Sequence, residues 1–505
     1  MNRSLSQRRL ISAAFGLSIA AASASAAAQA TPLPESIVVG AWTFRPLIEV
    51  RIRGEYRRHP FDAGGEVYAP TAVLYEEYGS TLPRVVDRQP GVKNQYSIAE
   101  RSRFGLAVDR GPVTAAVTLQ DARVWGSTAA AVLGPGQPQV PVFAPYEAYL
   151  DVHTRSGRRV FLRVGRQAVS WGDGRLLGSN DWSATGRSLD AARFGFQAGD
   201  FDVELLASML ATPGRYRPTS VSSGTAGGTT TGASGSLGAL GSLGASGADL
   251  VEGSGAQLYG LNAVWHPLPL LNIELTGLAR IVREPVANTT LTPSNTFVID
   301  GRISGDRRGF RYAVEGAYEL GKVSWYGTNR DLRAFAFAAR ASWETALPGH
   351  LTFGAQGAYA SGDDGQSTGT LKRFDPILPD ERTNLSPMSL FAWSNVIFGG
   401  GTVGVRPIDE LNLTAGYHYA ALAQPGGRWT DAALNPIGAA PSSTSRAMGH
   451  EIDASIKITP WRPLEIETGY GLFVRGSGAR EILFAVERPA TLQHWAYLQT
   501  TFRAP

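Results

Sequence analysis

Residues 271–281 have the sequence LNIELTGLARI, and this stretch decides the fold class. Its odd-numbered positions hold only apolar side chains or glycine, whereas four of its even-numbered positions are polar. These four residues are Asn272, Glu274, Thr276 and Arg280. Alternation with a period of two predicts a β-strand that has one apolar and one polar face. The run has the length of a transmembrane strand, about ten residues, and exceeds the roughly five or six that are usual in soluble domains.

The same alternation recurs along the chain and predicts eighteen strands. The predicted strands are 40–57, 96–109, 112–125, 143–155, 159–170, 188–199, 201–212, 255–266, 270–284, 296–304, 309–320, 333–346, 350–361, 388–406, 410–422, 446–459, 463–475 and 491–503. An even number of strands that cross a membrane leaves both ends of the chain on the same side.

The predicted connections alternate strictly between short turns and long loops. The long loops are 58–95, 126–142, 171–187, 213–254, 285–295, 321–332, 362–387, 423–445 and 476–490. Short periplasmic turns and long extracellular loops are typical of outer-membrane barrels, whereas a soluble β-sandwich gives no reason for this separation. Only a closed barrel lets strands lie in lipid with every backbone group paired. We therefore predict an all-β fold, a transmembrane antiparallel β-barrel of about eighteen strands in the outer membrane of a Gram-negative bacterium.

The N-terminal residues 1–30 are predicted to be an export signal peptide. Arg3, Arg8 and Arg9 precede a short apolar segment, and small residues at 28–30 offer a cleavage site. The β-barrel then occupies residues 31–505. Within it, residues 220–250 form a low-complexity Gly/Ser-rich loop, which we expect to be an external loop because it lacks the apolar bulk to form a core.

The charge and cysteine content narrow the possible functions. Removal of the signal peptide with its three arginines lowers the formal net charge from +4 to +1. Since there is also no Lys/Arg-rich run, the sequence predicts no binding to nucleic acid. The chain has no cysteine, which excludes disulfide bonds and thiolate metal sites.

No motif in the sequence predicts catalysis or a resident cofactor. The segment GGGTVG (399–404) matches a dinucleotide-binding pattern, but it lies inside a predicted strand and no helix follows it. The seven histidines lack metal-ligand spacing, and there is no G-x-S-x-G nucleophile elbow. Asp363 and Asp364 in SGDDG (361–365) could hold calcium in an external loop, although a solvated acidic loop is the simpler interpretation. We predict that the protein is not an enzyme.

Charged residues follow the strand faces that point away from the predicted lipid face. On the lipid face a charge costs about 2–4 kcal/mol near the membrane midplane, so these residues are expected to line a lumen. Arginines in a narrow pore create a positive field and offer bidentate contacts to carboxylates. Alternatively, the charges only brace the wall by pairing with one another. The predicted pore-lining residues are Arg51, Arg53, Arg101, Arg103, Arg163, Arg193, Arg280, Arg302, Arg340 and Lys457.

The segment WGDGRLLGSNDWSATGR (171–187) gathers charged residues between glycines and tryptophans. It lacks a nucleophile–base pair, so a folded external loop that shapes the pore mouth is a better interpretation than a catalytic site. The predicted pore-mouth residues are Asp173, Arg175, Asp181, Arg187 and Asp190.

The sequence LRVGRQAVSWGDGRLLGSNDWSATGRSLDAARF (162–194) resembles the strand–loop–strand core of the alginate export family of outer-membrane porins. Further similar motifs are SGDD with FDP (361–376), GHEID (449–453) and GYGLFVRGSG (469–478). The resemblance implies an eighteen-stranded monomeric barrel with an electropositive pore that passes an acidic polysaccharide. The matching charged positions are Arg163, Arg166, Asp173, Arg175, Arg187, Asp190 and Arg193.

These observations lead to a passive outer-membrane channel for anionic solutes as the first functional hypothesis. The solute would be an acidic, alginate-like exopolysaccharide or small anions, and periplasmic export proteins could be partners. A general or organic-acid porin is the first alternative. A barrel enzyme or an adhesin is the alternative of another class.

Overall fold

The computed structural model describes residues 35–59, 94–125, 142–154, 160–210, 255–268, 270–283, 293–325, 328–363, 369–382, 385–434, 436–437, 445–484 and 490–504. The predicted signal peptide and the Gly/Ser-rich loop 220–250 lie outside the described residues.

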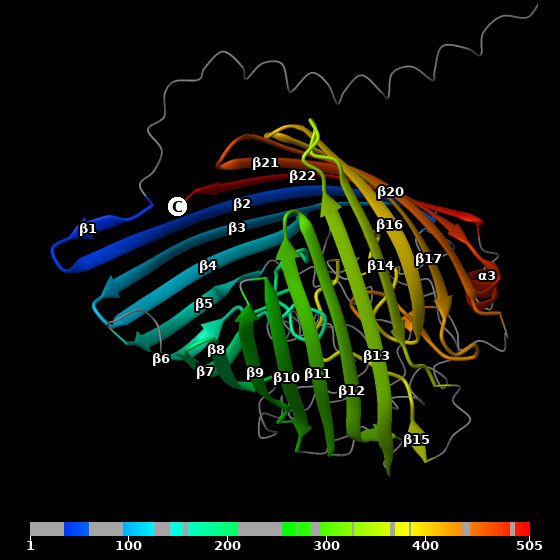
Figure 1. Ribbon diagram of the computed structural model, residues 1–505, viewed down its shortest axis with the longest axis horizontal. Coiled ribbons are helices and arrows are strands. Elements are labelled where there is room, and N and C mark those ends of the chain that lie inside the picture. The colour runs from blue at the N-terminus through cyan, green and yellow to red at the C-terminus, as the bar shows by residue number, and fades with distance from the viewer. Residues whose placement is uncertain are drawn as a thin grey trace, which may run out of the picture.

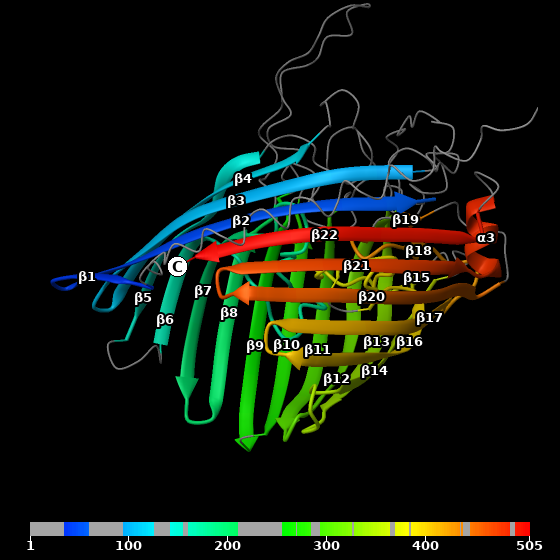
Figure 2. The ribbon, with the colours of Figure 1, turned by 90° about the horizontal axis from the view of Figure 1, so that it is seen from above.

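Eighteen antiparallel strands close into a barrel, which confirms the predicted fold class. These strands are β2 (Trp42–Arg58), β3 (Asn94–Arg110), β4 (Val113–Trp125), β5 (Val142–His153), β6 (Val160–Gln167), β7 (Leu189–Ala198), β8 (Phe201–Met209), β9 (Gln257–Leu268), β10 (Leu271–Val282), β11 (Ser294–Arg307), β12 (Phe310–Trp325), β13 (Thr328–Glu344), β14 (Thr352–Ala360), β16 (Val396–Ile408), β17 (Leu411–Leu422), β20 (Ala447–Trp461), β21 (Leu464–Arg475) and β22 (Leu492–Ala504). Each strand pairs with its neighbour in the chain, and β22 pairs with β2 to close the barrel (Figures 1 and 2).

Short elements complete the described structure. They are β1 (Ile37–Val39), β15 (Thr370–Leu371), β18 (Trp429–Thr430), β19 (Pro436–Ile437) and the helix α3 (Ser477–Phe484). β1 forms a hairpin with the start of β2, and α3 lies between β21 and β22 in the chain. Among the described residues, no helix combines the length and the apolar character that crossing a bilayer requires.

Two predicted boundaries were wrong. The strand predicted at 388–406 begins only at Val396, because residues 388–395 are an apolar loop segment that packs inside the barrel and contains left-handed backbone at Ser389 and Asn395. The long loop predicted at 321–332 is instead a tight hairpin, because β12 continues to Trp325 and β13 begins at Thr328. Strand pairing continues through the polar residues Lys322, Ser324, Asn329 and Asp331.

Alternation of the side chains gives the barrel an apolar outer face. On β10 and its neighbour β11, Leu275 and Ile299 point outward and are 60% and 62% exposed, whereas Thr276 and Asp300 point inward and are buried. Such an outer face would be unfavourable in water and matches a lipid environment. The stretch 271–281 therefore forms the transmembrane strand that its alternation predicts.

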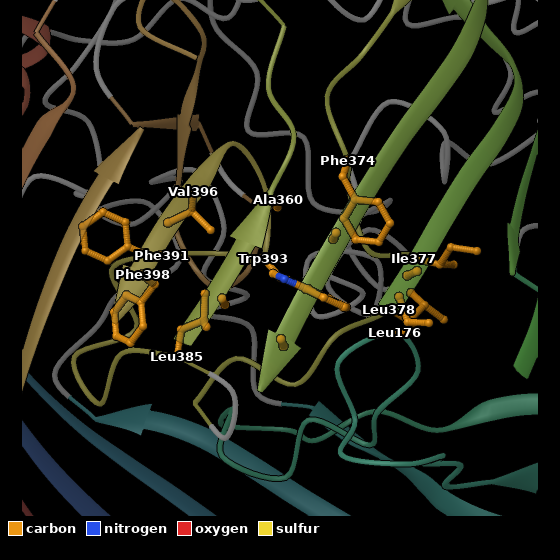
Figure 3. Close-up of a cluster of buried hydrophobic side chains, with 14 of the residues drawn as sticks. Leu176, Ala360, Phe374, Ile377, Leu378, Leu385, Phe391, Trp393, Val396 and Phe398 are labelled. Atoms are coloured by element: carbon orange, nitrogen blue, oxygen red, sulfur yellow. The ribbon is translucent and has the colours of Figure 1, made fainter. Parts of the chain in front are cut away.

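The lumen is filled in part by two of the long connections. We call residues 168–188, between β6 and β7, the first lumen loop, and the described residues 369–382 and 385–395, between β14 and β16, the second lumen loop. The second lumen loop carries an apolar cluster that includes small inward-facing residues of β13 and β14. Ala336 of β13 belongs to it. Figure 3 shows Ala360 of β14 beside the loop residues. The indole N–H of Trp393 donates to the wall carbonyls of Phe337 and Tyr359, at 3.3 and 3.2 Å. The loop is thus packed as a core inside the barrel.

Candidate functional site in the lumen

The first lumen loop leaves β6 and crosses the lumen before it returns to β7. At its start the indole N–H of Trp171 donates to Glu204 of β8 at 2.7 Å. Gly172 and Gly174 follow in left-handed backbone conformations, which glycine adopts without steric cost. They allow the chain to turn back on itself, and the backbone N–H of Trp171 donates to the carbonyl of Leu177.

The two lumen loops are joined by a backbone ladder and by a buried arginine. Leu177 and Leu378 form a parallel bridge. The guanidinium of Arg187 donates to three carbonyls, those of Gly178, Leu378 and Pro379, at 2.7–3.1 Å. Burial lowers the pKa of Arg187 to about 10, so it remains charged at neutral pH. Arg187 therefore holds the loops together rather than facing a solute at the pore mouth.

A second junction between the loops is formed by side-chain amide and carboxylate groups. Asn180 donates to the carboxylate of Glu381 at 2.6 Å and accepts from the backbone N–H of Glu381 at 3.2 Å. Its own backbone N–H donates to the carboxylate of Asp380. Burial raises the pKa of Asp380, although this hydrogen bond and the charge of Arg187 oppose the rise.

Four of the predicted pore-lining arginines lie beneath the tip of the first lumen loop. They come from β2 and β3, and they point inward as their strand positions predict. They are Arg51, Arg53, Arg101 and Arg103, each 1–6% exposed. Arg51 donates to the carbonyls of Asp181 and Ser183, and Arg53 donates to that of Trp182 at 2.6 Å. These arginines fix the loop to the wall and are not open to the lumen.

Arg101 and Arg103 also hold the carboxylate of Asp181, at 2.9 and 3.0 Å. Partial burial raises the pKa of Asp181, but the guanidiniums of Arg101, Arg103 and Arg51 outweigh this effect and lower the pKa to about 2. Glu49 of β2 accepts from Arg101 at 2.6 Å on one side and from Arg503 of β22 at 2.6 Å on the other.

The charges on this wall do not balance. We call the ion-paired group on β2, β3, β22 and the loop tip the basic wall. It comprises Arg51, Arg53, Arg57, Arg101, Arg103 and Arg503 with Glu49, Glu55 and Asp181. Six guanidiniums therefore meet three carboxylates. Backbone carbonyls satisfy many of the guanidinium hydrogen bonds, but a neutral carbonyl does not cancel a positive charge. The basic wall keeps an excess of positive charge.

On the opposite side of the lumen the loop carries acidic and basic residues that pair with the wall. The carboxylate of Asp173 accepts from Arg302 of β11 at 2.6 Å and from Arg340 of β13 at 2.7 Å. Arg175 pairs with Glu315 of β12 at 3.1 Å, and burial lowers the pKa of Arg175. Arg340 is 45% exposed, so part of its guanidinium faces the lumen.

Below this contact the lumen contains a cavity of about 570 Å³ on the side of the short turns. Arg302, Arg311 and Arg340 line it together with polar side chains and the glycine backbone of β14 and β16. Glycine matters here because a Cβ at Gly354 would lie 2.4 Å from the hydroxyl of Thr402, and one at Gly400 would lie 2.2 Å from the ring of His418. We call this cavity the vestibule.

The remaining predicted pore-lining residues point inward, and three of them are paired with carboxylates. Arg163 pairs with Asp151 at 2.9 Å, Arg193 with Glu204 at 2.7 Å and Lys457 with Glu465 at 2.6 Å. Arg280 lies on the inward face of β10 and is half-buried. These three residues therefore fit the alternative interpretation, in which charges on the inward face pair with one another and brace the wall.

The prediction that Asp190 lies at the pore mouth was wrong. Leu189 and Ala191 occupy the inward positions of β7, so the strand turns Asp190 to the outer face with Phe194. There it pairs with Arg166 of β6 at 2.7 Å. Both residues belong to the motif that resembles the alginate export family. Their positions on β6 and β7 place them on the outer face, where they form an ion pair.

Sequence reasoning missed the residues that hold the loop tip from the side of the second lumen loop. Arg382 stacks on Trp182 at 3.7 Å, and Arg53 stacks on the same indole at 4.0 Å. The hydroxyl of Tyr497 accepts from Arg382 at 2.6 Å and donates to Glu467 at 2.5 Å. No sequence signal places residue 382 near 182, because only the inward folding of both loops brings them together.

In SGDDG, the segment for which we considered calcium binding, Asp363 is held by the backbone of the second lumen loop. The carboxylate of Asp363 is buried and accepts from the backbone N–H of Lys372 at 2.9 Å, whereas Asp364 lies outside the described residues. Within the described part of the chain, His, Asp and Glu side chains do not gather in a group of three that could hold a metal ion.

Comparison with known proteins identifies the family and the fold. The family described as Alginate export matches residues 84–217 and 281–482. OccK9 (OpdG) of Pseudomonas aeruginosa has a TM-score of 0.53 at 11% identity and covers 91% of this chain and 98% of its own. OccAB1 of Acinetobacter baumannii has a TM-score of 0.53 at 10% identity, with 91% and 96% covered. The outer membrane protein opdK of Pseudomonas aeruginosa has a TM-score of 0.51 at 7% identity, with 91% and 98% covered. No curated protein sequence matches significantly.

The closed barrel, its apolar outer face and the family match have one consistent explanation. The chain is a porin-like β-barrel of the outer membrane of a Gram-negative bacterium. Because their sequence identities are low, the solved structures support only the fold in this conclusion.

Proposed function

From the premise that this chain belongs to the alginate export family of outer-membrane barrels, we propose that it is a passive channel for anionic solutes. The observation that supports this most strongly is the basic wall, where six guanidiniums meet three carboxylates beneath the first lumen loop. Charge inside a low-dielectric wall acts over a longer distance than charge in water, so the excess attracts anions and repels cations.

The proposed solute is a polymer of acidic sugars or a smaller organic anion. A guanidinium offers paired N–H donors that match a carboxylate, and Arg340 is partly open to the vestibule. Weak successive contacts of this kind would exchange water around a carboxylate without trapping it. The name of the family suggests the acidic polysaccharide alginate, and the proposal of a uronate polymer for this chain follows from that membership together with the basic wall.

Transport would be passive, and we propose no catalytic role. A barrel enzyme would need a nucleophile and a base within hydrogen-bond reach at the rim, and no observation on the described residues favours that arrangement. Calcium in an external loop remains a separate hypothesis that a metal titration would test.

The test of the proposal is the reversal potential of the full chain in a planar bilayer under a KCl gradient. We expect anion selectivity, and we expect current block by oligouronates but not by neutral oligosaccharides of equal length. Arg51→Lys keeps the charge and should keep the selectivity, whereas Arg51→Gln should reduce it. If both variants behave alike, the arginines act only as supports for the loop. A cation-selective or unselective wild-type channel would contradict the proposal and favour a general porin.

A further inference from the structure

The outer face of the barrel differs between two sectors at its extracellular end. The short turns mark the periplasmic end of each strand, so outward positions can be followed from there toward the long loops. On β10, β12 and β13 every outward position is uncharged until a basic residue appears. These residues are Arg283 directly after β10, Lys322 on β12 and Arg333 on β13, and all three are exposed.

Counting along the strands places these three residues at one boundary. Lys322 is the thirteenth residue from Phe310, where β12 begins, and Arg333 is the twelfth from Glu344, where β13 ends. A transmembrane strand needs about 9–11 residues. All three basic residues therefore lie just beyond the lipid tails, at the level of the headgroups of the outer leaflet.

The residues below the three cations complete an interfacial surface. Tyr318 and Phe335 are cross-strand partners on the outer face, and Phe335 stacks on Tyr359 with ring centroids 5.6 Å apart. Aromatic girdles mark the interface in outer-membrane barrels. Arg333 lies directly above Phe335, at the position opposite Leu320.

The register brings the three cations close together. Arg333 and Lys322 are on adjacent strands, and Lys322 and Arg283 are two strands apart. With a strand spacing of about 4.8 Å and a rise of about 3.4 Å per residue, Lys322 lies roughly 8 Å from Arg333 and roughly 12 Å from Arg283, and Arg283 lies roughly 20 Å from Arg333. Asp331, opposite Lys322, is the one acidic residue on the outward positions of this sector that the structure describes at this level.

The other sector of the same rim lacks this excess of positive charge. There two of the outward arginines lie beside acidic residues: Arg123 pairs with Asp121 at 2.9 Å, and Arg166 pairs with Asp190 at 2.7 Å. A third, Arg58, is exposed at the end of β2, opposite Asn94 and His494. Glu100 adds a further acidic group next to Arg123 on the paired strand. This sector therefore provides a matched comparison at the same membrane level.

We propose that Arg283, Lys322 and Arg333 form a docking surface for a phosphorylated glycolipid of the outer leaflet. The occupant follows from the position at the headgroup level, from the aromatic girdle beneath and from charge complementarity. Each Lys or Arg at a membrane surface strengthens binding to an anionic lipid roughly fivefold. A docked lipid would hold β10–β13 in the membrane on the side of the barrel where the first lumen loop is anchored through Asp173.

The experiment compares two triple variants of the full chain in detergent by native mass spectrometry. One variant combines Arg283→Gln, Lys322→Gln and Arg333→Gln. The control combines Arg58→Gln, Arg123→Gln and Arg166→Gln, which removes the same charge from outward positions of the other sector. Heat-modifiable migration on gels checks that both variants fold. The probes are bis-phosphorylated lipid A, dephosphorylated lipid A and inorganic phosphate.

We expect the first variant to bind bis-phosphorylated lipid A at least tenfold more weakly than the unmodified chain, and the control to change by less than twofold. Dephosphorylated lipid A should bind equally weakly to all three. Equal losses in both variants, or no loss in either, would overturn the proposal, because the three residues would then provide only general charge. Competition by inorganic phosphate at the same concentration as lipid A would overturn the lipid as the occupant.

Discussion

Replacing Arg187 with methionine should release the first lumen loop from the second. The guanidinium is 2% exposed and donates three hydrogen bonds to carbonyls of both loops. A hydrogen bond to a charged group contributes about 1.5–3 kcal/mol, and the carbonyls of Leu378 and Pro379 would lose this donor. The loss is partly offset, because burial lowers the pKa of Arg187 to about 10 and the variant no longer buries a charge. We expect docking to weaken by about 3 kcal/mol, roughly a hundredfold in population.

Single-channel recording can detect this change because the loop crosses the lumen. The Arg187→Met channel should show larger conductance and more frequent transitions between open levels. Arg166→Met is the matched control, since it removes an arginine from an outer-face ion pair that does not touch the loop. It should conduct like the unmodified chain.

The lack of cysteine in the chain allows a direct rescue. Leu177 and Leu378 are bridge partners, so cysteines at both positions fall within the Cα separation that a disulfide accepts. In the Arg187→Met background, oxidation of this pair should restore the smaller conductance, and reduction should reverse the effect. Unchanged conductance in Arg187→Met, or a disulfide that restores nothing, would refute the view that Arg187 holds the loops together.

Three further predictions concern the same loops. Gly178→Ala should destabilise the junction by about 1–3 kcal/mol, because its Cβ would lie 2.3 Å from the carboxylate of Asp380, and conductance should rise. Gly277→Ala on β10 is the matched control and should leave conductance unchanged, because its Cβ would meet no atom within 4 Å. Because the pKa of Asp181 is lowered to about 2, its contribution to the docking of the loop is complete above about pH 4 and is lost as the pH falls toward 2. The current noise of the unmodified channel should therefore rise as the pH falls from 5 to 2, and constant current noise over this range would contradict the prediction. Glu451→Gln should loosen the second lumen loop, whose Ser386 hydroxyl and Met388 N–H donate to that carboxylate, and intrinsic tryptophan fluorescence should report the exposure of Trp393.

The fold was predictable because lipid imposes one rule on every strand. Alternation at 271–281 and at the equivalent positions of the other strands reflects an apolar outer face, and the alternation of loop lengths reflects the two sides of the membrane. The predicted strand boundaries were wrong where a segment does not lie in the lipid. Residues 388–395 are mostly apolar because they pack inside the barrel. Residues 322–325 and 328–331 are mostly polar although they belong to β12 and β13, because these strands extend beyond the lipid.

The site was harder to predict because an inward-facing charge does not reveal its partner. Parity correctly turns Arg51 and Arg101 toward the lumen, but their partners include the carbonyl of Asp181, which lies 130 and 80 residues away in the sequence. Asp190 belongs to a motif that suggests a pore mouth, yet one step along the strand places it on the outer face. A motif identifies residues that matter to a family, and parity is needed to assign each of them to lumen or lipid.

One sequence signal for the inward-folded loops was nevertheless present. A water-filled lumen favours polar inward positions, but the inward positions of β13 are alanines at 334, 336 and 338, and Leu278 interrupts the polar face of the stretch 271–281. All four side chains are buried, because the lumen loops cover them. Apolar residues on the inward face of a barrel strand therefore mark where a loop must pack. Groups of the loop form hydrogen bonds and ion pairs with the charged residues that face this packed region. The ion selectivity of the channel then depends on the net charge that these contacts leave unbalanced.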